Sequence, residues 1–285
     1  MINTCHMVFR WILAFGFTTL VSGAWAQERL VSIGGAVTEI VYALDQQHLL
    51  VGRDTTSTWP KEANALPDIG YARALSPEGV LSVAPTLIIA EQNTGPQETI
   101  EVLKAANIPY ITIKDGYTRE GIVGKIRAVA KALNVPQRGE ELAQKVNQQL
   151  LNAEQAVSQV TEKQKVLFIL STRSGKIMAA GADTAANGII GLAGGENVFS
   201  EFTGYKQVSD EAVTQANPDI ILMMGAQAGR GNHDADNDAL FAMPALQTTN
   251  AALNQRVVRM DALLLLGFGP RSGSAITELH AAMYP

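Results

Sequence analysis

Tyr71 and Arg73 are the side chains of this sequence whose types and spacing best support ligand binding. They lie in the glycine-containing segment Pro67–Arg73 (PDIGYAR), which precedes a predicted helix. Loops of this kind gather around the ligands of open α/β sheets. Because a nearby cation favours an ionised phenol, the pair can present a phenolate, a hard anionic ligand suited to ferric iron. A loop tyrosine can equally be a packing or hydrogen-bonding residue, so the spacing leaves both interpretations open.

Patterns for catalysis and for free metal ions are incomplete. The sequence has no G-x-S-x-G nucleophile elbow, and Gly225–Gly231 (GAQAGRG) lacks the Gly-Lys-Ser/Thr ending of a phosphate-binding loop. Residues 234–238 resemble the start of a calcium loop, but Ala239 and Ala245 stand where that loop needs glycine and glutamate. These patterns disfavour an enzyme and a free metal site. The histidines after the first 26 residues have no metal-binding spacing: His48, His233 and His280.

Two segments, Leu75–Ile89 and Val208–Leu222, repeat one another at a constant offset of 133 residues. Each has near its beginning a serine that can cap a helix, continues with a helix that has a glutamate in its first turn, two residues after the serine, and ends with a proline and a strand. The glutamates are Glu78 and Glu211. A glutamate in the first turn is by itself a stable helix start, because its charge interacts favourably with the helix dipole. Two copies at one offset additionally predict two equivalent halves.

Short apolar strands alternate with helical segments along the chain. Helices are predicted at Thr38–Leu44 and Ile122–Leu133. Continuous apolar runs are typical of parallel strands buried on both faces. The sequence therefore predicts an α/β protein with mainly parallel sheets and helices on both faces of each sheet. The predicted strands are Arg29–Ile33, Leu87–Ala90, Tyr110–Ile113, Val166–Leu170, Ile220–Met224 and Arg256–Met260.

The segment 137–164 differs from its surroundings, because it has no glycine or proline after Gly139 and carries an apolar stripe. It predicts one helix of about 25 residues, about 38 Å long. We expect this helix to join two lobes, an N-terminal lobe of residues 27–136 and a C-terminal lobe of residues 165–285. The alternative is an ordinary surface helix within one domain. The stripe consists of Leu142, Val146, Leu150, Ala153 and Val157.

The first 26 residues predict export. Arg10 precedes an uncharged run, residues 11–21, and residues 24–26 (AWA) supply the small side chains that signal peptidase requires. We expect a cleavable signal peptide over residues 1–26, since a membrane anchor would need about 20 apolar residues. The only cysteine, Cys5, precedes the apolar run, so the mature chain would contain no thiol.

The composition limits the classes of partner. Hydrophobic residues make up 47% of the 285 residues, enough to form a core, which excludes a disordered chain. The net charge of −5 disfavours a general nucleic-acid binder, which would usually carry a basic surface. No apolar run after the first 26 residues is long enough to span a membrane. We expect an exported protein that binds no nucleic acid and is not embedded in a membrane.

Five motifs are spread along the chain: residues 68–78 (DIGYARALSPE), 179–187 (AAGADTAAN), 192–199 (LAGGENVF), 204–209 (GYKQVS) and 260–271 (MDALLLLGFGPR). Together they resemble the periplasmic haem-binding proteins of bacterial haem ABC importers, over essentially all of Glu28–Pro285. The third motif is shared with binding proteins for cobalamin and siderophores, whereas the first and last are more particular to the haem branch. The resemblance implies two α/β lobes joined by one long helix.

The resemblance also implies roles for particular residues. Tyr71 matches the axial ligand of the haem iron, and Arg230 matches an arginine that faces this tyrosine across the cleft. Arg73 and Arg173 are further candidates for holding the haem propionates. Some relatives have a second-lobe histidine near residues 171–174. This chain has none there, so the resemblance leaves open whether a second-lobe iron ligand and a stacked pair of haems carry over to it.

Glu78 and Glu211 match the two glutamates, one in each lobe, that dock on the permease dimer. The resemblance therefore implies a monomeric periplasmic solute-binding protein that is not an enzyme. It would capture haem between its lobes and deliver it to an inner-membrane ABC importer. The alternatives are the same fold binding cobalamin or a ferric siderophore, and a secreted α/β enzyme that uses the cleft.

Overall fold

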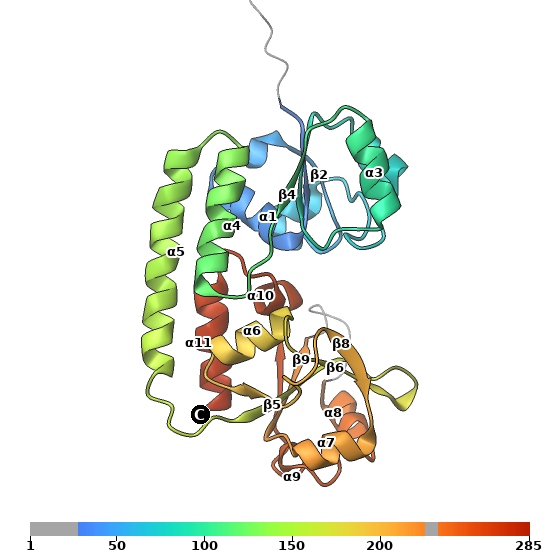
Figure 1. The fold of residues 1–285 in the computed structure, drawn as a ribbon, viewed down its shortest axis with the longest axis vertical. Coiled ribbons are helices and arrows are strands. Elements are labelled where there is room, and N and C mark those ends of the chain that lie inside the picture. The colour runs from blue at the N-terminus through green and yellow to red at the C-terminus, as the bar shows by residue number, and fades with distance from the viewer. Residues whose placement is uncertain (1–27, 226–232) are drawn as a thin grey trace, which may run out of the picture.

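The computed structural model describes residues 28–225 and 233–285. Two sheets, each with its own helices, form an upper and a lower lobe, and one long helix runs beside both (Figure 1). The expected signal peptide and Arg230 lie outside the described residues. In the described part of the chain, no helix is both long enough and apolar enough to cross a membrane.

The upper lobe contains, in chain order, β1 (Leu30–Ile33), α1 (Gly35–Ala43), β2 (Leu50–Arg53), α2 (Pro77–Leu81), β3 (Leu87–Glu91), α3 (Gln97–Ala105), β4 (Tyr110–Ile113) and α4 (Arg119–Ala132). Its four strands are all parallel, in the order β2-β1-β3-β4. Helices α1 and α4 cover one face of the sheet, and α2 and α3 cover the other. Every residue of β1 is buried, as expected for an apolar strand between two helical layers.

The lower lobe contains β5 (Lys165–Ser171), β6 (Ile177–Ala180), α6 (Ala185–Leu192), β7 (Glu196–Asn197), β8 (Tyr205–Val208), α7 (Asp210–Ala216), β9 (Ile220–Met224), α8 (His233–Phe241), α9 (Asn250–Leu253), β10 (Val257–Met260), α10 (Ala262–Leu266) and α11 (Ser272–Met283). The strand order is β10-β9-β5-β6-β8, with β7 beside β5. The pairs β5–β6 and β6–β8 are antiparallel, and the other pairs are parallel. The mainly parallel α/β fold expected from the sequence is confirmed.

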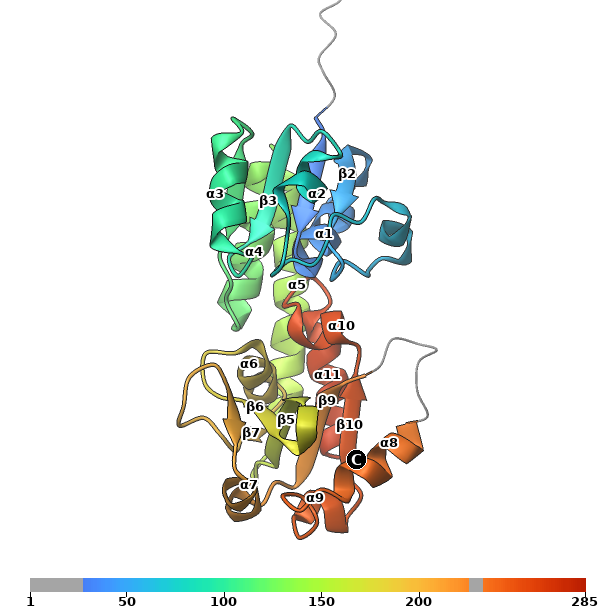
Figure 2. The ribbon, with the colours of Figure 1, turned by 90° about the vertical axis from the view of Figure 1, so that its right-hand side faces the viewer.

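The helix α5 (Pro136–Val157) runs along both lobes (Figures 1 and 2). Its 22 residues span about 33 Å at 1.5 Å per residue. Val146, Leu150 and Ala153 of the expected apolar stripe are buried, and the helix packs against α4 and α11. The covalent connection between the lobes is therefore stiffened by neighbouring helices from each of them.

The helix α5 ends at Val157, earlier than the sequence-based expectation of residue 164. The Ser158 hydroxyl donates to the carbonyl of Gln155 at 2.7 Å, and the chain then turns. The β-branched residues Val160 and Thr161 follow, and such residues are weak helix formers. The last residues of the predicted helix instead form the connection that leads into β5.

The C-terminal segment forms a second, non-covalent link between the lobes. Gly35, the first residue of α1, lies so close to Leu263 of α10 that the leucine side chain leaves no room for a Cβ. The Lys125 ammonium of α4 donates to the carbonyl of Gly267, with 3.2 Å between nitrogen and oxygen. Because α10 follows β10 directly, the carboxyl ends of β1 and β10 face each other. One hydrophobic core runs continuously through both lobes.

Candidate functional site

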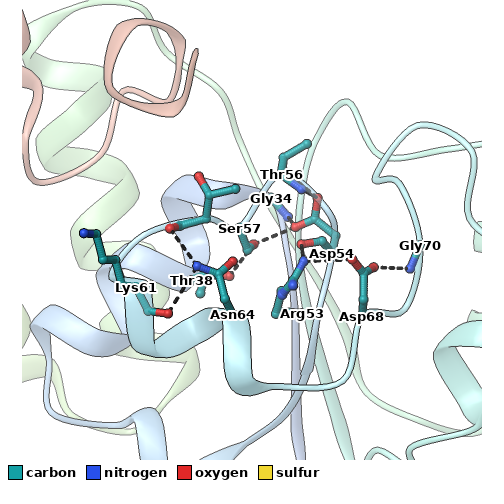
Figure 3. A network of polar contacts seen from close by, with 11 residues as sticks. Gly34, Thr38, Arg53, Asp54, Thr56, Ser57, Lys61, Asn64, Asp68 and Gly70 are labelled. Atoms are coloured by element: carbon teal, nitrogen blue, oxygen red, sulfur yellow. Dashed lines mark hydrogen bonds and ion pairs between the residues drawn. The ribbon is translucent and has the colours of Figure 1, made fainter. Parts of the chain in front are cut away.

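The loop that carries Tyr71 is tied back to the end of β2. The backbone of Arg53 pairs with residues 67–69, and the Arg53 guanidinium donates to the Asp68 carboxylate at 2.9 Å. The other oxygen of Asp68 accepts the N–H of Gly70 at 2.9 Å (Figure 3). Gly70 has a φ of 106°, which residues with a side chain rarely adopt. These contacts fix the direction in which the chain enters Tyr71.

The fully buried Asp54 anchors the beginning of the same loop (Figure 3). One carboxylate oxygen accepts the N–H of Gly34 at 2.8 Å and the hydroxyl of Ser57 at 2.7 Å. The other accepts the N–H and the hydroxyl of Thr56, at 2.9 and 2.6 Å. Because Gly34 immediately precedes α1, this carboxylate joins the loop after β2 to the start of a buried helix. A buried charge with four donors is well compensated.

Tyr71 presents an exposed phenol beside a cation. Its side chain is 44% exposed, and Arg73 Nη1 donates to its oxygen with 3.0 Å between the atoms. The turn is closed by a bond from the N–H of Ala74 to the carbonyl of Tyr71 at 2.8 Å, and the N–H of Gly95 holds it through the carbonyl of Ala72 at 2.9 Å. An exposed phenol oxygen paired with a guanidinium is suited to bind a ferric centre as a phenolate.

The positive charge of Arg73 also affects the pKa of two tyrosines near the boundary between the lobes. Burial raises the pKa of Tyr117 to about 12, and the Arg73 cation opposes this shift. Burial likewise raises the pKa of Tyr205, at the start of β8, and Arg73 again opposes it. Tyr117 meets Phe268 of the lower lobe edge-on, with 5.1 Å between ring centroids. We call Tyr71, Arg73, Tyr117 and Tyr205 the inter-lobe site.

An ionic cluster lies beside Tyr117. The Lys125 ammonium, whose side chain is 1% exposed, is 3.4 Å from Asp115 and 3.6 Å from Glu91. Burial raises the pKa of Glu91 to about 7, although Lys125 lowers it. Asn93 donates to the second oxygen of Asp115 at 2.6 Å. Sequence reasoning missed this cluster, although a glutamate that ends the buried apolar run of β3 was a signal.

A second arginine stacks on an exposed tryptophan. Trp59 is 41% exposed, and the guanidinium carbon of Arg271 lies 4.4 Å from the centroid of its ring, a cation–π contact. Arg271 also donates to the buried carboxylate of Glu39 from its backbone N–H at 3.1 Å and from its guanidinium at 3.0 Å. Burial raises the pKa of Glu39, and Arg271 opposes the shift. The sequence patterns gave no sign of this contact between lobes.

Two arginines named from the sequence are not brought to Tyr71 by the described structure. Arg173 is exposed in the 3-10 turn Arg173–Gly175 between β5 and β6, and no described contact joins it to Tyr71 or Arg73. Arg230 lies outside the described residues. Of the arginines expected to surround a ligand, Arg73 is therefore the one that the structure places at the phenol.

Glu78 and Glu211 occupy equivalent positions in the two lobes. Each is exposed in the first turn of its helix, α2 or α7, behind a serine N-cap. The Ser76 hydroxyl accepts the N–H of Gly79 at 3.0 Å, and the Ser209 hydroxyl accepts an N–H in the same way at 3.2 Å. Both helices lead into a strand, β3 or β9, that pairs with the first strand of its lobe. The sequence repeat therefore corresponds to a structural repeat.

A surface cavity of about 370 Å³ lies elsewhere, where α5 leads into β5. Tyr284, one of its lining residues, donates to the carbonyl of Gly194 at 2.8 Å, and His280 contacts the carbonyl of Ala193 at 3.0 Å. These polar groups are engaged in holding the C-terminus, which gives them a structural role. Over the ranges that the structure describes, no cluster of three or more His, Cys, Asp or Glu side chains is placed to hold a metal ion.

Two α/β lobes joined by a long helix, with an exposed phenol and cation near their boundary, define a two-lobe solute-binding protein. The chain belongs to the periplasmic binding protein family, whose sequence profile matches residues 30–264.

Solved structures of periplasmic haem-binding proteins share this fold, which confirms the resemblance seen in the motifs. RhuT from Roseiflexus sp. RS-1, in its apo form, has a TM-score of 0.84 and 37% identity over 90% of this chain and 98% of RhuT. BhuT in complex with two haems has a TM-score of 0.83 and 37% identity over 90% of this chain and 97% of BhuT. The vitamin B12-binding protein of Pectobacterium atrosepticum is 27% identical over 97% of this chain and 98% of its own length.

Proposed function

We propose that this protein captures haem in the periplasm and delivers it to an inner-membrane ABC importer, with the haem held between the two lobes. The observation that carries the proposal is the exposed Tyr71 phenol, 3.0 Å from the Arg73 guanidinium. The similarity to RhuT and BhuT supports the same ligand class. Haem is cargo here, and we propose no catalytic role for the inter-lobe site.

Tyr71 supplies the axial ligand to the ferric haem iron in this proposal. The phenolate oxygen binds the metal, and the hydrogen bond from Arg73 compensates the charge that remains on the oxygen. Arg73, Arg173 and Arg230 provide cations for the two propionates. The anchored loop around Asp54 and Asp68 holds the phenol in place before haem arrives, which reduces the entropy lost on binding.

Cobalamin is the second ligand that the relatives suggest, through the vitamin B12-binding protein of Pectobacterium atrosepticum. An anionic phenol ligand favours haem, because the ferric centre of haem has a vacant axial position for a hard anion. The higher identity to RhuT and BhuT, 37% against 27%, points the same way.

The proposal places the mature chain in the periplasm as a monomer, after cleavage of the signal peptide behind Ala26. Glu78 and Glu211 dock on the two subunits of the permease. Support for this docking comes from their exposure at equivalent helix starts, one in each lobe.

Titration of the purified mature protein with hemin tests the ligand and the iron contact together. We expect a Soret band and the charge-transfer band of a phenolate-ligated, high-spin ferric haem in the unchanged protein. Tyr71→Phe removes only the hydroxyl and is expected to abolish the charge-transfer band. Tyr42→Phe, on the upper-lobe helix α1, is the matched control and is expected to keep it. A corrinoid complex with no haem binding would instead support cobalamin.

A further inference from the structure

Tyr205 lies at the start of the edge strand β8 and has a fixed backbone. Its neighbour Gly204 has a φ of 78° and bonds through its N–H to the carbonyl of Ala182 at 2.9 Å, while its own carbonyl accepts the N–H of Gly181 at 2.7 Å. Tyr205 then pairs in register with Ala180 of β6. The backbone that carries this tyrosine is therefore held by residues 180–182, at the end of β6.

The Tyr205 side chain is large, supported and accessible. It is 38% exposed, and its ring rests against that of the fully buried Phe168, with 6.4 Å between centroids and 59° between planes. An aromatic ring that contacts the core and is still partly exposed is preorganised to receive a flat apolar ligand, since little rotamer entropy remains to be lost.

Tyr205 belongs to the lower lobe but interacts electrostatically with the upper lobe. The Arg73 cation, which donates to Tyr71, also acts on the Tyr205 phenol. The helix α6, whose N-cap Thr184 interacts with Tyr205, touches the upper lobe as well, because Gly188 leaves no room for a Cβ beside Tyr117. Tyr71 and Tyr205 therefore lie on opposite lobes, with the Arg73 charge in reach of both.

The two phenols differ in the chemistry that they can supply. Burial raises the pKa of Tyr205, so this phenol stays protonated at neutral pH. A protonated phenol is a poor iron ligand and a good hydrogen-bond donor. A haem offers a matching pair of features, a flat apolar face and two anionic propionates at its edge.

We propose that Tyr205 is the aromatic contact that the lower lobe makes with the haem, on the face opposite Tyr71. Its ring packs on the porphyrin, and its hydroxyl donates to a propionate and leaves the iron five-coordinate. This inference rests on the proposed function. It also assigns a lower-lobe contact to a chain that has no histidine at residues 171–174.

The test measures haem release into an excess of apomyoglobin by stopped flow, with spectra of each starting complex. We expect Tyr205→Phe to keep the wild-type spectrum and to release haem on the order of 10-fold faster, as for the loss of one hydrogen bond to an anion. Tyr205→Ala is expected to release haem about 10- to 100-fold faster, because the ring contact is lost as well. Haem dimethyl ester lacks the propionate charges. With this ligand, we expect Tyr205→Phe to increase the rate of release less than it does with haem.

Two results would overturn the inference. If both Tyr205 variants release haem at the wild-type rate, Tyr205 makes no contact with it. If Tyr205→Phe shifts the Soret or charge-transfer band as Tyr71→Phe does, Tyr205 ligates iron. Both results presuppose that the unchanged protein and Tyr42→Phe bind haem. If these two proteins bind none, the proposed function itself is wrong.

Discussion

At the scale of single residues, the direction of Tyr71 depends on the backbone conformation of the glycine before it. Gly70 has a φ of 106°, and a Cβ added there would meet only Leu75 at 3.9 Å. Space is therefore available, and the conformation alone resists a side chain. Gly124 in α4 is a natural comparison, because a Cβ there meets nothing within 4 Å and its backbone is helical.

We therefore predict that Gly70→Ala lowers the free energy of unfolding by about 1–3 kcal/mol and weakens haem binding, because the strained loop turns Tyr71 away. Gly124→Ala is expected to raise stability by about 0.5–1 kcal/mol and to leave haem binding unchanged. Urea unfolding and hemin titration measure the two effects. If both variants show the same change in stability and the same haem binding, the conformation of Gly70 is not required to orient Tyr71.

The buried Glu91 predicts a pH dependence. Its pKa is about 7 in the folded protein against an ordinary 4.5, so the folded state binds more protons than the unfolded state between these values. The stability that Glu91 contributes is therefore greatest at low pH, decreases as pH rises from about 4.5 to about 7, and stays constant above.

We expect the difference in free energy of unfolding between wild type and Glu91→Gln to favour wild type more at about pH 5 than at about pH 8. Urea unfolding at both values measures it, and pH effects of other groups cancel in the difference. The control is Glu101→Gln, at an exposed residue. Its difference in free energy of unfolding from wild type should depend less on pH. A difference that grows toward high pH would contradict the argument.

At the scale of elements, the C-terminal segment restrains the lobes as α5 does. The loop between α10 and α11 receives the Lys125 ammonium and places Arg271 against Glu39 of α1. Glu39 is 6% exposed, so removing the Arg271 guanidinium leaves a nearly buried carboxylate without its charged partner and with only the backbone N–H of residue 271 as a donor. The contact therefore ties the end of the chain to the first helix of the upper lobe.

We predict that Arg271→Met lowers the free energy of unfolding by about 1–3 kcal/mol, as for a buried polar group left unsatisfied. The double variant Glu39→Gln with Arg271→Met should recover part of the loss, because no unpaired charge remains. Arg127→Met removes the partner of the surface residue Glu140 and should cost less, since solvent screens that pair. Chemical denaturation measures all three. If the Arg271→Met protein is as stable as the Arg127→Met control, the contact between Arg271 and Glu39 does not tie the C-terminal segment to the upper lobe.

At the scale of the whole molecule, both lobes present a glutamate at an equivalent helix start. A permease dimer offers two equivalent surfaces, which a protein with a structural repeat can contact in the same way on each side. Charge complementarity at such contacts fixes orientation and speeds encounter more than it adds affinity. The alternative is that both glutamates only stabilise their own helices.

We predict that Glu78→Ala with Glu211→Ala leaves haem binding unchanged but lowers haem transport and ATP hydrolysis several-fold in vesicles that carry the permease. The control, Glu98→Ala with Glu278→Ala, changes the same charge at exposed helical positions of the two lobes. It should transport normally. Normal transport by the Glu78 and Glu211 variant would show that these side chains serve only their helices.

The sequence determined the features that depend on neighbours in the chain. Apolar runs of four to five residues specified buried parallel strands, such as β1 and β3. The stripe of α5 specified a long helix, and the spacing of Tyr71 and Arg73 allowed their hydrogen bond, because two residues of one turn cannot lie far apart. Helix periodicity and turn chemistry are local, so one sequence sufficed for them.

Only the tertiary structure decided which distant groups meet. Tyr205 comes within reach of the Arg73 charge, Arg271 stacks on Trp59, and Lys125 bonds to Gly267. The partners in these pairs are more than 100 residues apart in the chain, and no local pattern marks them. Their proximity follows from how two lobes and a continuous core pack together. The sequence therefore located the phenol, and the packing supplied the groups that surround it.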